Sequence, residues 1–277
     1  MHINLYRELA KNNVARAGLL ILGGFLLLSI LAPLFTRDPS AVSAETMQPP
    51  SFKHLLGTND VGQDVWSRLV YGARTSLVVA VGAGALATMI SFLLGAGAAV
   101  FGGITEQAVM RAADAFLILP GIVVMIVVSA WIQPGSAVLV LLIAVFHWQG
   151  GARIIRARTR SLLSRSHLRA AKTCGAGRGY LLYRHIFPEL VPLLLVSFIF
   201  SARAAVFTEA GLAFIGISGP ERISWGTMIH HALNFYYLPV WKWWLIPPGA
   251  AVSLLITGFA FTGNALEKII DPRLRDA

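Results

Sequence analysis

Long stretches without a charged residue constrain this chain more than any other feature of its sequence. Five of them cover residues 18–35, 75–105, 115–152, 190–202 and 243–266. A helix that crosses a membrane needs about 20 mostly apolar residues. In hydrocarbon every backbone polar group must find its partner within the structure, and none of these stretches alternates as a barrel strand does. The sequence therefore predicts an all-α integral membrane protein.

Three of the stretches need interpretation before spans can be counted. The third is too long for one helix, and the turn signal at 133–136 divides it into predicted helices at 115–132 and 137–152. We expect the fourth to continue towards Ile217. The first is longer than the core of a signal peptide and lacks a small-residue cleavage site after it, so we interpret it as an uncleaved span. The result is six spans, with both termini on the same side.

Positive charge is concentrated in one segment. Only 13% of the residues are charged, against about 25% in soluble domains, yet the formal net charge is +10. Residues 153–188 hold nine Lys and Arg and no Asp or Glu, and Arg7, Lys11 and Arg16 add charge to the N-terminal tail. Because loops rich in Lys and Arg stay in the cytoplasm, we predict a multi-pass protein of the inner (plasma) membrane with both termini cytoplasmic. The charge is then a topology signal and does not indicate nucleic acid as a partner.

The same basic segment carries the clearest local pattern. Apolar residues interleave with arginines at helical spacing from Ile154 to Thr173, and three glycines then break the pattern. A short apolar stretch at 180–186 ends at Pro188, which suits the first turn of the next span. We predict a helix, a glycine turn and a short helix. From the residues alone, this unit either rests on anionic membrane lipid or docks into a groove of a soluble partner.

Within this segment, Ala170-Ala171, Gly175, His185 and Pro188 resemble the EAA signature of bacterial ABC importer permeases. In that family, an Ala-Ala pair, a Gly four residues on and a later His-x-x-Pro belong to coupling helices that dock into ATP-binding subunits. The resemblance implies the same role for these residues. Arg169 stands where the family has the acidic residue that gives the signature its name, so the ionic contact of that acid is not expected here.

A second resemblance lies between the first two spans. The run 56–77 is similar to the pattern GTDxxGRDxxSRLxYGARxSL of the C-type permeases for dipeptides, oligopeptides and nickel, with Gln63 in place of an arginine. The motif positions that we single out are Gly57, Thr58, Asp60, Gly62, Asp64 and Arg68. Further pieces follow in family order at Met110-Arg111, Asp114, 209–216, 224–226 and 271–273. The resemblance implies a six-helix, type I (MetI-like) importer permease with cytoplasmic coupling helices.

The resemblance also implies partners and a transport function. Six helices would form half of a pathway, completed by a homologous second permease, two ATP-binding subunits and an extracytoplasmic solute-binding protein. The chain contains no GxxxxGK[ST] phosphate loop, so ATP and Mg²⁺ are expected on the partner subunits, and the chain is not expected to be an enzyme or to bind a cofactor itself. The implied cargo is di- or oligopeptides. Nickel or a metal chelate is the alternative that the sequence leaves open.

We divide the chain into two parts. Residues 1–71 hold the N-terminal tail, the first span and an extracytoplasmic loop, and residues 72–277 hold the five-helix permease core. Within the loop, residues 39–71 are expected to be partly ordered, with a surface helix. Six glycines fall in or at the end of the second span, and Gly95 and Gly97, with the alanines at 96, 98 and 99, are expected to let helix backbones approach closely.

Few polar side chains of the spans invite a functional interpretation. Arg203 and Glu209 are the charges nearest the membrane interior, but they are six residues apart and do not face each other along a helix. We interpret Glu209 as lining the pathway or stabilising the helix-to-loop transition, and a hydrogen bond in the interfacial zone is the alternative. His230 and His231 point about 100° apart on a helix and have no nearby Cys or acidic cluster, so no metal site is predicted. Cys174, the single cysteine, is expected to be an ordinary unpaired thiol.

Overall fold

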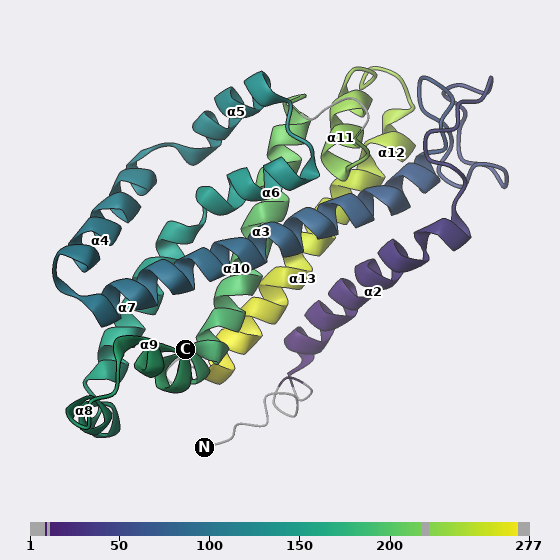
Figure 1. Cartoon of the computed structure of the whole chain (residues 1–277). Helices are drawn as coiled ribbons and strands as arrows, with labels where there is room; N and C mark the ends of the chain where they lie inside the picture. Colours follow the sequence, from purple (N-terminus) through teal and green to yellow (C-terminus); the bar gives the residue numbers. More distant parts are fainter. Residues whose placement is uncertain (1–8, 10–11, 218–221, 271–277) are drawn as a thin grey trace.

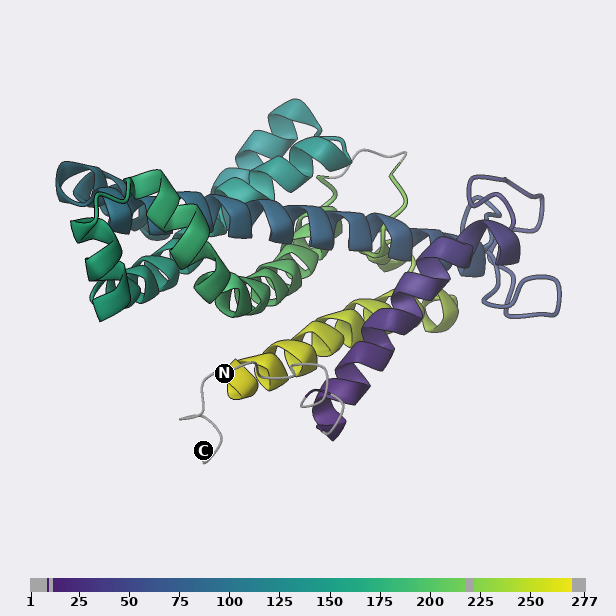
Figure 2. The same cartoon turned by 60° about the horizontal axis from the view of Figure 1, so that its bottom comes forward.

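Residues 9, 12–217 and 222–270 are described by a computed structural model, and every regular element in them is a helix. The elements are α2 (Asn13–Phe35), α3 (Val65–Phe101), α4 (Gly103–Ile118), α5 (Gly121–Ile132), α6 (Ser136–Val145), α7 (Trp148–Leu163), α8 (Ser166–Thr173), α9 (Arg178–Tyr180), η1 (Leu181–Ile186), α10 (Phe187–Phe214), α11 (Trp225–Leu233), α12 (Trp241–Trp244) and α13 (Ile246–Ile270). Figures 1 and 2 show α3 and α10 in the middle of the molecule, with α2 and α13 on one side and α5 and α6 on the other. The predicted all-α architecture is confirmed.

Four helical runs are long and apolar enough to cross a membrane. They are Asn13–Leu34, Val65–Phe101, Arg178–Phe214 and Trp241–Ile270. Two further pairs, α4 with α5 and α6 with α7, pass the same test together but bend by 79° and 48°. With each bent pair taken as one broken span, the number of spans reaches the six predicted from the sequence.

The third and fourth spans differ from the straight helices predicted at 115–132 and 137–152. The third starts with α4 and bends by 79° at Pro120. Proline lacks the N–H that would continue the helix, and it disfavours helical geometry at the residue before it. The fourth bends by 48° next to His147, whose Nδ1 lies 2.8 Å from the carbonyl oxygen of Ile143. Neither Pro nor Gly marks this second bend, so periodicity alone does not reveal it.

The second and fifth spans begin earlier than predicted. α3 starts at Val65 and not at Thr75, and its 37 residues are about 55 Å long, against roughly 30 Å of hydrocarbon. The sequence predicts a separate short helix before the fifth span, and this prediction is wrong. The helix is continuous from Arg178 through α9, η1 and α10 to Phe214. The apolar stretch at 180–186 is therefore the first part of the span itself.

Residues 36–64 form a polar cap at one end of α3 (Figure 1). The surface helix predicted in this loop is absent: residues 39–64 contain no helix, and the helical residues from Val65 onward belong to α3. Asp64 is the N-cap of α3, and its carboxylate accepts the backbone N–H of Ser67 at 2.8 Å. The boundary that we draw between residues 71 and 72 thus falls inside α3.

Small residues let the central helices approach closely. A Cβ atom on Gly84 of α3 would lie 2.9 Å from Cβ of Ala202 in α10, and one on Gly95 would lie 2.4 Å from the carbonyl oxygen of Ala152 in α7. Gly97, in contrast, has no such atom within 4 Å. The prediction of a close approach is thus confirmed at Gly95 and wrong at Gly97, and the structure adds Gly84; glycine at such contacts is common between membrane helices.

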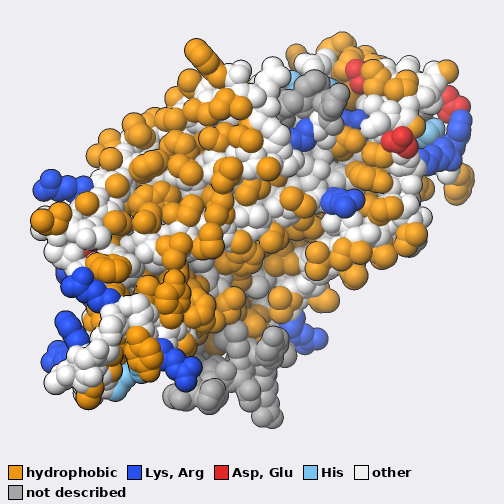
Figure 3. Space-filling model, viewed as in Figure 1, with side chains coloured by type: hydrophobic (Ala, Val, Ile, Leu, Met, Phe, Trp, Pro, Cys, Tyr) orange, Lys and Arg blue, Asp and Glu red, His pale blue; other side chains and the backbone are white. Residues whose placement is uncertain are grey.

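The surface separates apolar from charged side chains along the molecule. Figure 3 shows hydrophobic side chains over the middle of the visible face, acidic ones mainly at the end with the polar cap, and a group of Lys and Arg at the opposite end. Leu20, Ile118 and Trp131 on the spans are 74%, 82% and 89% exposed. Such extensive apolar exposure suits contact with lipid or with another membrane subunit. The chain is an integral membrane protein with two chemically different ends.

Candidate functional site

Residues 164–188, called the docking segment after the role predicted for them, lie at the basic end; they include α8, the link to the fifth span and the first turns of that span. The single helix predicted over 154–173 is interrupted at Ser164-Arg165, which separates α7 from α8. The side chain of Leu168 is 1% exposed and anchors α8 in an apolar cluster. Other members of that cluster are Phe92, Ile155, Leu162, Leu181, Leu182 and Ile186. One apolar side of α8 is thus fixed to the spans.

Charged contacts hold the start of α8 against the start of α10. Arg165 Nη1 donates to Glu189 Oε2 at 2.5 Å, and His167 Nε2 lies 3.5 Å from Glu189 Oε1. All three side chains are partly or well exposed to solvent. Such pairs contribute little to stability, so Leu168 carries most of the anchoring.

Gly175 ends α8 for a reason that concerns backbone geometry. Its φ is +86°, in the left-handed region that favours glycine. Its N–H donates to the carbonyl oxygen of Lys172 at 3.1 Å, and the N–H of Ala176 donates to that of Ala171 at 3.0 Å. This pair of bonds is the Schellman motif, in which Gly occupies the first position after the cap residue. The spacing between Ala171 and Gly175 is therefore the length of a capped last turn.

The helix continues through Pro188. The turn before this proline is π-helical, which is wider than an α-helical turn and does not need a hydrogen bond from the proline nitrogen to the carbonyl group four residues earlier. The six residues of η1 are π-helical, and the N–H of Phe187 donates to the carbonyl oxygen of Leu182. Proline inside an α-helix clashes with the carbonyl group four residues earlier. Wider π-helical turns frequently accompany such interruptions. The structure places Pro188 at the start of α10, as predicted, but within a continuous helix.

The rest of the docking segment forms an open surface. Its exposed residues include Arg169, Ala170, Lys172, Thr173, Cys174 and Gly175, while Ala171 is half-buried. Tyr180 and Tyr183 are 58% and 64% exposed, and the ring of His185 packs edge-on against that of Tyr180 with centroids 5.5 Å apart. Small side chains next to exposed tyrosine rings and basic residues suit close approach by a protein partner.

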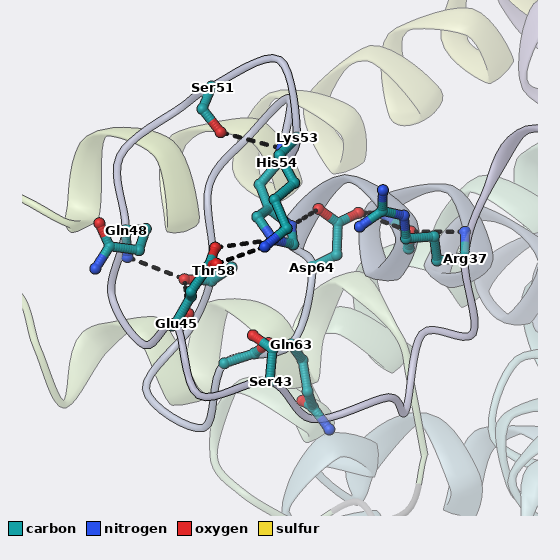
Figure 4. Close-up of polar contacts among 12 residues, drawn as sticks. Arg37, Ser43, Glu45, Gln48, Ser51, Lys53, His54, Thr58, Gln63 and Asp64 are labelled. Carbon is teal, nitrogen blue, oxygen red and sulfur yellow. Dashed lines mark hydrogen bonds and ion pairs between the residues drawn. The ribbon is translucent and has the colours of Figure 1, made fainter.

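At the opposite end, the motif residues of the polar cap hold one another in place (Figure 4). Thr58 is fully buried, donates to the carbonyl oxygen of Glu45 at 2.6 Å and accepts the N–H of Gln48 at 2.9 Å. Asp64 Oδ1 lies 2.9 Å from Nδ1 of His54, whose side chain is 6% exposed. These bonds give Thr58 and Asp64 of the motif a structural role in shaping the cap.

Both cap glycines are required by space as well as by conformation. Gly57 and Gly62 have φ of +71° and +78°. A Cβ atom on Gly57 would lie 2.2 Å from the carbonyl oxygen of Gln48, and one on Gly62 would lie 2.0 Å from that of Ser43. Neither position therefore accepts any other residue without a shift of the backbone.

Asp60 and Arg68 line a hollow of about 240 Å³ between the cap and α11. Arg68 Nη1 donates to Gln63 Oε1 at 2.6 Å. Gln63, which stands where the family pattern has an arginine, therefore bonds to another residue of the same motif. His231 faces the same hollow, and desolvation of its ring together with the nearby Arg68 guanidinium lowers the pKa of His231. His230 lies apart, with Nδ1 2.8 Å from the carbonyl oxygen of Phe214.

Glu209 is 1% exposed and pairs with a residue that the sequence does not suggest. Its Oε1 lies 3.5 Å from Arg222 Nη2, and its Oε2 lies 3.4 Å from the Ser76 hydroxyl. Arg203 is not brought to it, and its guanidinium lies 5.1 Å from the ring centroid of Phe200. The Glu209–Arg222 pair connects the end of α10 to the segment before α11, which is where a helix-to-loop transition takes place.

Sequence reasoning also missed an ion-pair cluster between α4 and α7. Arg156 Nε and Arg160 Nη2 both donate to the carboxylate of Glu106, which is 4% exposed as a residue. The available signal was the spacing of the two arginines, which puts both on one face of a helix. Among the motif pieces, 271–273 lies outside the described residues, as do Arg7 and Lys11 of the basic tail.

Comparison with known proteins covers nearly the whole chain. Residues 87–276 match the family described as binding-protein-dependent transport system inner membrane component, and residues 4–50 match the N-terminal TM domain of oligopeptide transport permease C. The oligopeptide transport system permease protein OppC of Bacillus subtilis is 32% identical over 268 residues, which are 96% of this chain and 87% of that protein. A Brucella suis protein, named as a candidate peptide permease, is 35% identical over 266 residues, 95% of this chain and 88% of its own.

Proposed function

Because this chain belongs to the inner membrane components of binding-protein-dependent transport systems, we propose that it forms half of the pathway of an ATP-driven importer for oligopeptides. The names of its relatives support peptides as the cargo. A homologous second permease completes the pathway, and an extracytoplasmic solute-binding protein delivers the peptide. ATP and Mg²⁺ are bound by two further subunits, and this chain contributes no residue to hydrolysis.

The single observation that carries the coupling role is the construction of the docking segment. α8 is anchored on one side by Leu168, capped at Gly175, and exposed over the residues that resemble the EAA signature. A helix held to the spans in this way can receive a push from a soluble subunit and pass it on as a rigid body. Arg169, at the position of the family's acidic residue, offers a positive charge to that partner.

The charge distribution supports the orientation that we propose. The docking segment and the end of α13 lie at one end of the spans, and the polar cap lies at the other (Figure 1). The docking segment is rich in Arg and Lys, which favours the cytoplasmic side. Both termini are then cytoplasmic, and the polar cap faces the solute-binding protein.

Cys174 provides a direct test, because it is the only cysteine and it is exposed. In vesicles from cells that make this chain without its ATP-binding partners, we expect a membrane-impermeant maleimide to label Cys174 in inside-out vesicles and not in right-side-out ones. The matched control is Phe52→Cys in a Cys174→Ser background, since Phe52 is fully exposed in the polar cap and should show the opposite pattern. Labelling of Cys174 from the outside would overturn the proposed orientation.

The coupling role is tested on the complex purified in mild detergent. We expect ATPase activity and a second permease to co-purify with the tagged chain, and Cys174 to be protected from maleimide in the complex but not in the isolated chain. A deletion strain should also fail to grow on trialanine as its amino-acid source. Full Cys174 reactivity in an active complex would refute docking at α8, and normal growth on the peptide would refute the cargo.

A further inference from the structure

The seam between α4 and α7 changes in character along its length. Near the two bends it is apolar and aromatic: the ring of Phe116 packs edge-on against those of Phe146 and Trp148, with centroids 5.6 and 6.0 Å apart. Towards the basic end the seam opens into a hollow of about 470 Å³. Glu106, Asp114, Arg156 and Arg160 are among the residues that line this hollow. Charge and not apolar packing therefore holds the two helices together at this end.

Glu106 is the centre of this charged half. Its side chain is only 6% exposed, and it accepts one bond from Arg156 Nε and one from Arg160 Nη2, the latter at 2.6 Å. The two arginines are one helical turn apart, so α7 presents both to the same carboxylate. Arg153, on the same face, pairs with Asp114 two turns along α4, but both of these side chains are about half exposed. An exposed pair contributes little, whereas a buried carboxylate that loses its partners is strongly penalised.

The position of this pair in the chain gives it a mechanical consequence. α7 leads directly into α8 through Ser164-Arg165, and Leu168 of α8 shares its apolar cluster with Ile155 and Leu162 of α7. A displacement of α8 therefore acts on α7 both through the chain and through this cluster.

α4 has only two buried residues, Glu106 and Ala113, and it joins α5 through the 79° bend at Pro120. At its basic end α4 is joined to α3 through Gly102 and Gly103, whose φ of +67° and +56° lie in the left-handed region that favours glycine. α4 can therefore move about this glycine link and the Pro120 bend, and the bonds of Glu106 oblige it to follow α7.

We propose that Glu106 is a positioning residue that transmits movement of the docking segment to α4, and through it to the broken third span. This inference rests on the proposed function, since it requires α8 to be displaced by ATP-binding subunits. While Arg156 and Arg160 hold the carboxylate, α4 and α7 move as one body. When the carboxylate is neutral, α7 moves without α4, and ATP hydrolysis no longer drives the pathway.

The test measures geometry as well as activity. In the full complex with Cys174→Ser, spin labels are placed at Ile104→Cys on α4 and Ile154→Cys on α7, which are 85% and 59% exposed. With Glu106 present, the distance between the labels should be the same without nucleotide and with ATP and vanadate. With Glu106→Gln, the distance should change between the two states. A distance that stays constant in Glu106→Gln would overturn the proposal.

The accompanying functional measurement is trialanine transported per ATP hydrolysed in proteoliposomes. Glu106→Gln should lower this ratio by about tenfold, which is within the usual range of coupling free energies. ATPase activity should persist, and in a Glu106→Gln protein that keeps Cys174, this cysteine should still be protected from maleimide. Glu106→Asp should restore most of the ratio, and Asp114→Asn, at the exposed pair, should leave it nearly unchanged. If Glu106→Gln retains a normal ratio, the transmission role fails although docking stands. If no ATP-binding subunit associates, the proposed function itself fails.

Discussion

The polar cap and the docking segment are both irregular connections between spans, yet they are built in opposite ways. The cap fixes itself through its own polar side chains: Thr58 and Asp64 each bond to several neighbours, and the cap glycines have no room for a side chain. In the docking segment, the polar groups of α8 bond mainly at the helix ends and one face of α8 is exposed, with Leu168 as the one buried side chain of that helix.

This difference corresponds to two mechanical properties. A segment whose bonds are mostly internal keeps its shape whatever happens around it, because each bond stabilises the others. A short helix with one anchoring side chain keeps its helical shape only while that side chain stays packed against the spans, since helices below about 12 residues are marginally stable alone in water. The cap therefore keeps its own shape, whereas the shape of α8 depends on what it packs against. These are the properties that the proposed function requires of a surface for the solute-binding protein and of a part that transmits displacement.

The strongest test of this comparison is one substitution made in both regions. Gly62→Ala in the cap adds a left-handed backbone penalty and places Cβ 2.0 Å from the carbonyl oxygen of Ser43. We expect a loss of about 4 kcal/mol from strain and overpacking together. Gly175→Ala in the docking segment adds only the backbone penalty, because no atom lies within 4 Å of its Cβ, and should cost about 1 kcal/mol.

Thermal unfolding of both variants in detergent measures this contrast. Gly97→Ala is the control, because it is helical and has open space, and it should be neutral or slightly stabilising. Equal destabilisation by Gly62→Ala and Gly175→Ala would mean that the cap is no more rigidly packed than the docking segment.

The two regions also differ in how far their sequence predicts their structure. The glycines and the N-cap carboxylate of the cap motif are recognisable as residue types, but their bonds join positions far apart in an irregular loop, such as His54 with Asp64. Nothing periodic marks such contacts, and the surface helix predicted there does not exist. In the docking segment, helical spacing predicts helix up to Thr173 and Gly175 predicts its end, because both signals are local in sequence, but the break at Ser164-Arg165 that separates α8 from α7 is not predicted.

Longer-range features escape prediction for a related reason. The apolar runs predict six spans, since length and hydropathy are local properties. The bend next to His147 and the pairing of Glu209 with Arg222 depend on the packing of several helices, and neither has a local signal. Glu106 is another example of a contact without a local signal. Its bonds to Arg156 and Arg160 become visible only when the fold places α7 beside α4.

The anchor of the docking segment gives the second prediction. Leu168→Ala removes the one buried side chain of α8, and we expect α8 to lose about 3 kcal/mol of the free energy that holds it against the spans. The loss should be local, so trypsin should cut after the basic residues of α8 roughly a hundredfold faster, while the melting temperature of the spans changes little. Ile154→Ala is the control, since that side chain is 59% exposed on α7. Slow proteolysis of Leu168→Ala would show that α8 is held by contacts other than this anchor.

The smallest effect is expected from the exposed ion pair of the cap, and it would sharpen the comparison by showing which cap bonds matter. Lys53 donates to Glu45, and this hydrogen bond lowers the pKa of Glu45 below its ordinary value of 4.5. A carboxyl group whose pKa is lowered by folding stabilises the fold above its unfolded pKa, and this contribution is lost as the pH falls through the lowered value. Both side chains are about half exposed, so solvent and salt screen the interaction. Glu45→Gln should therefore leave the melting temperature at pH 7 almost unchanged. It should remove only a small, salt-sensitive part of the decline in stability that sets in as the pH falls below the ordinary pKa of 4.5. A large loss at neutral pH would mean that the rigidity of the cap depends on its exposed charges, and not on the buried bonds of Thr58 and Asp64.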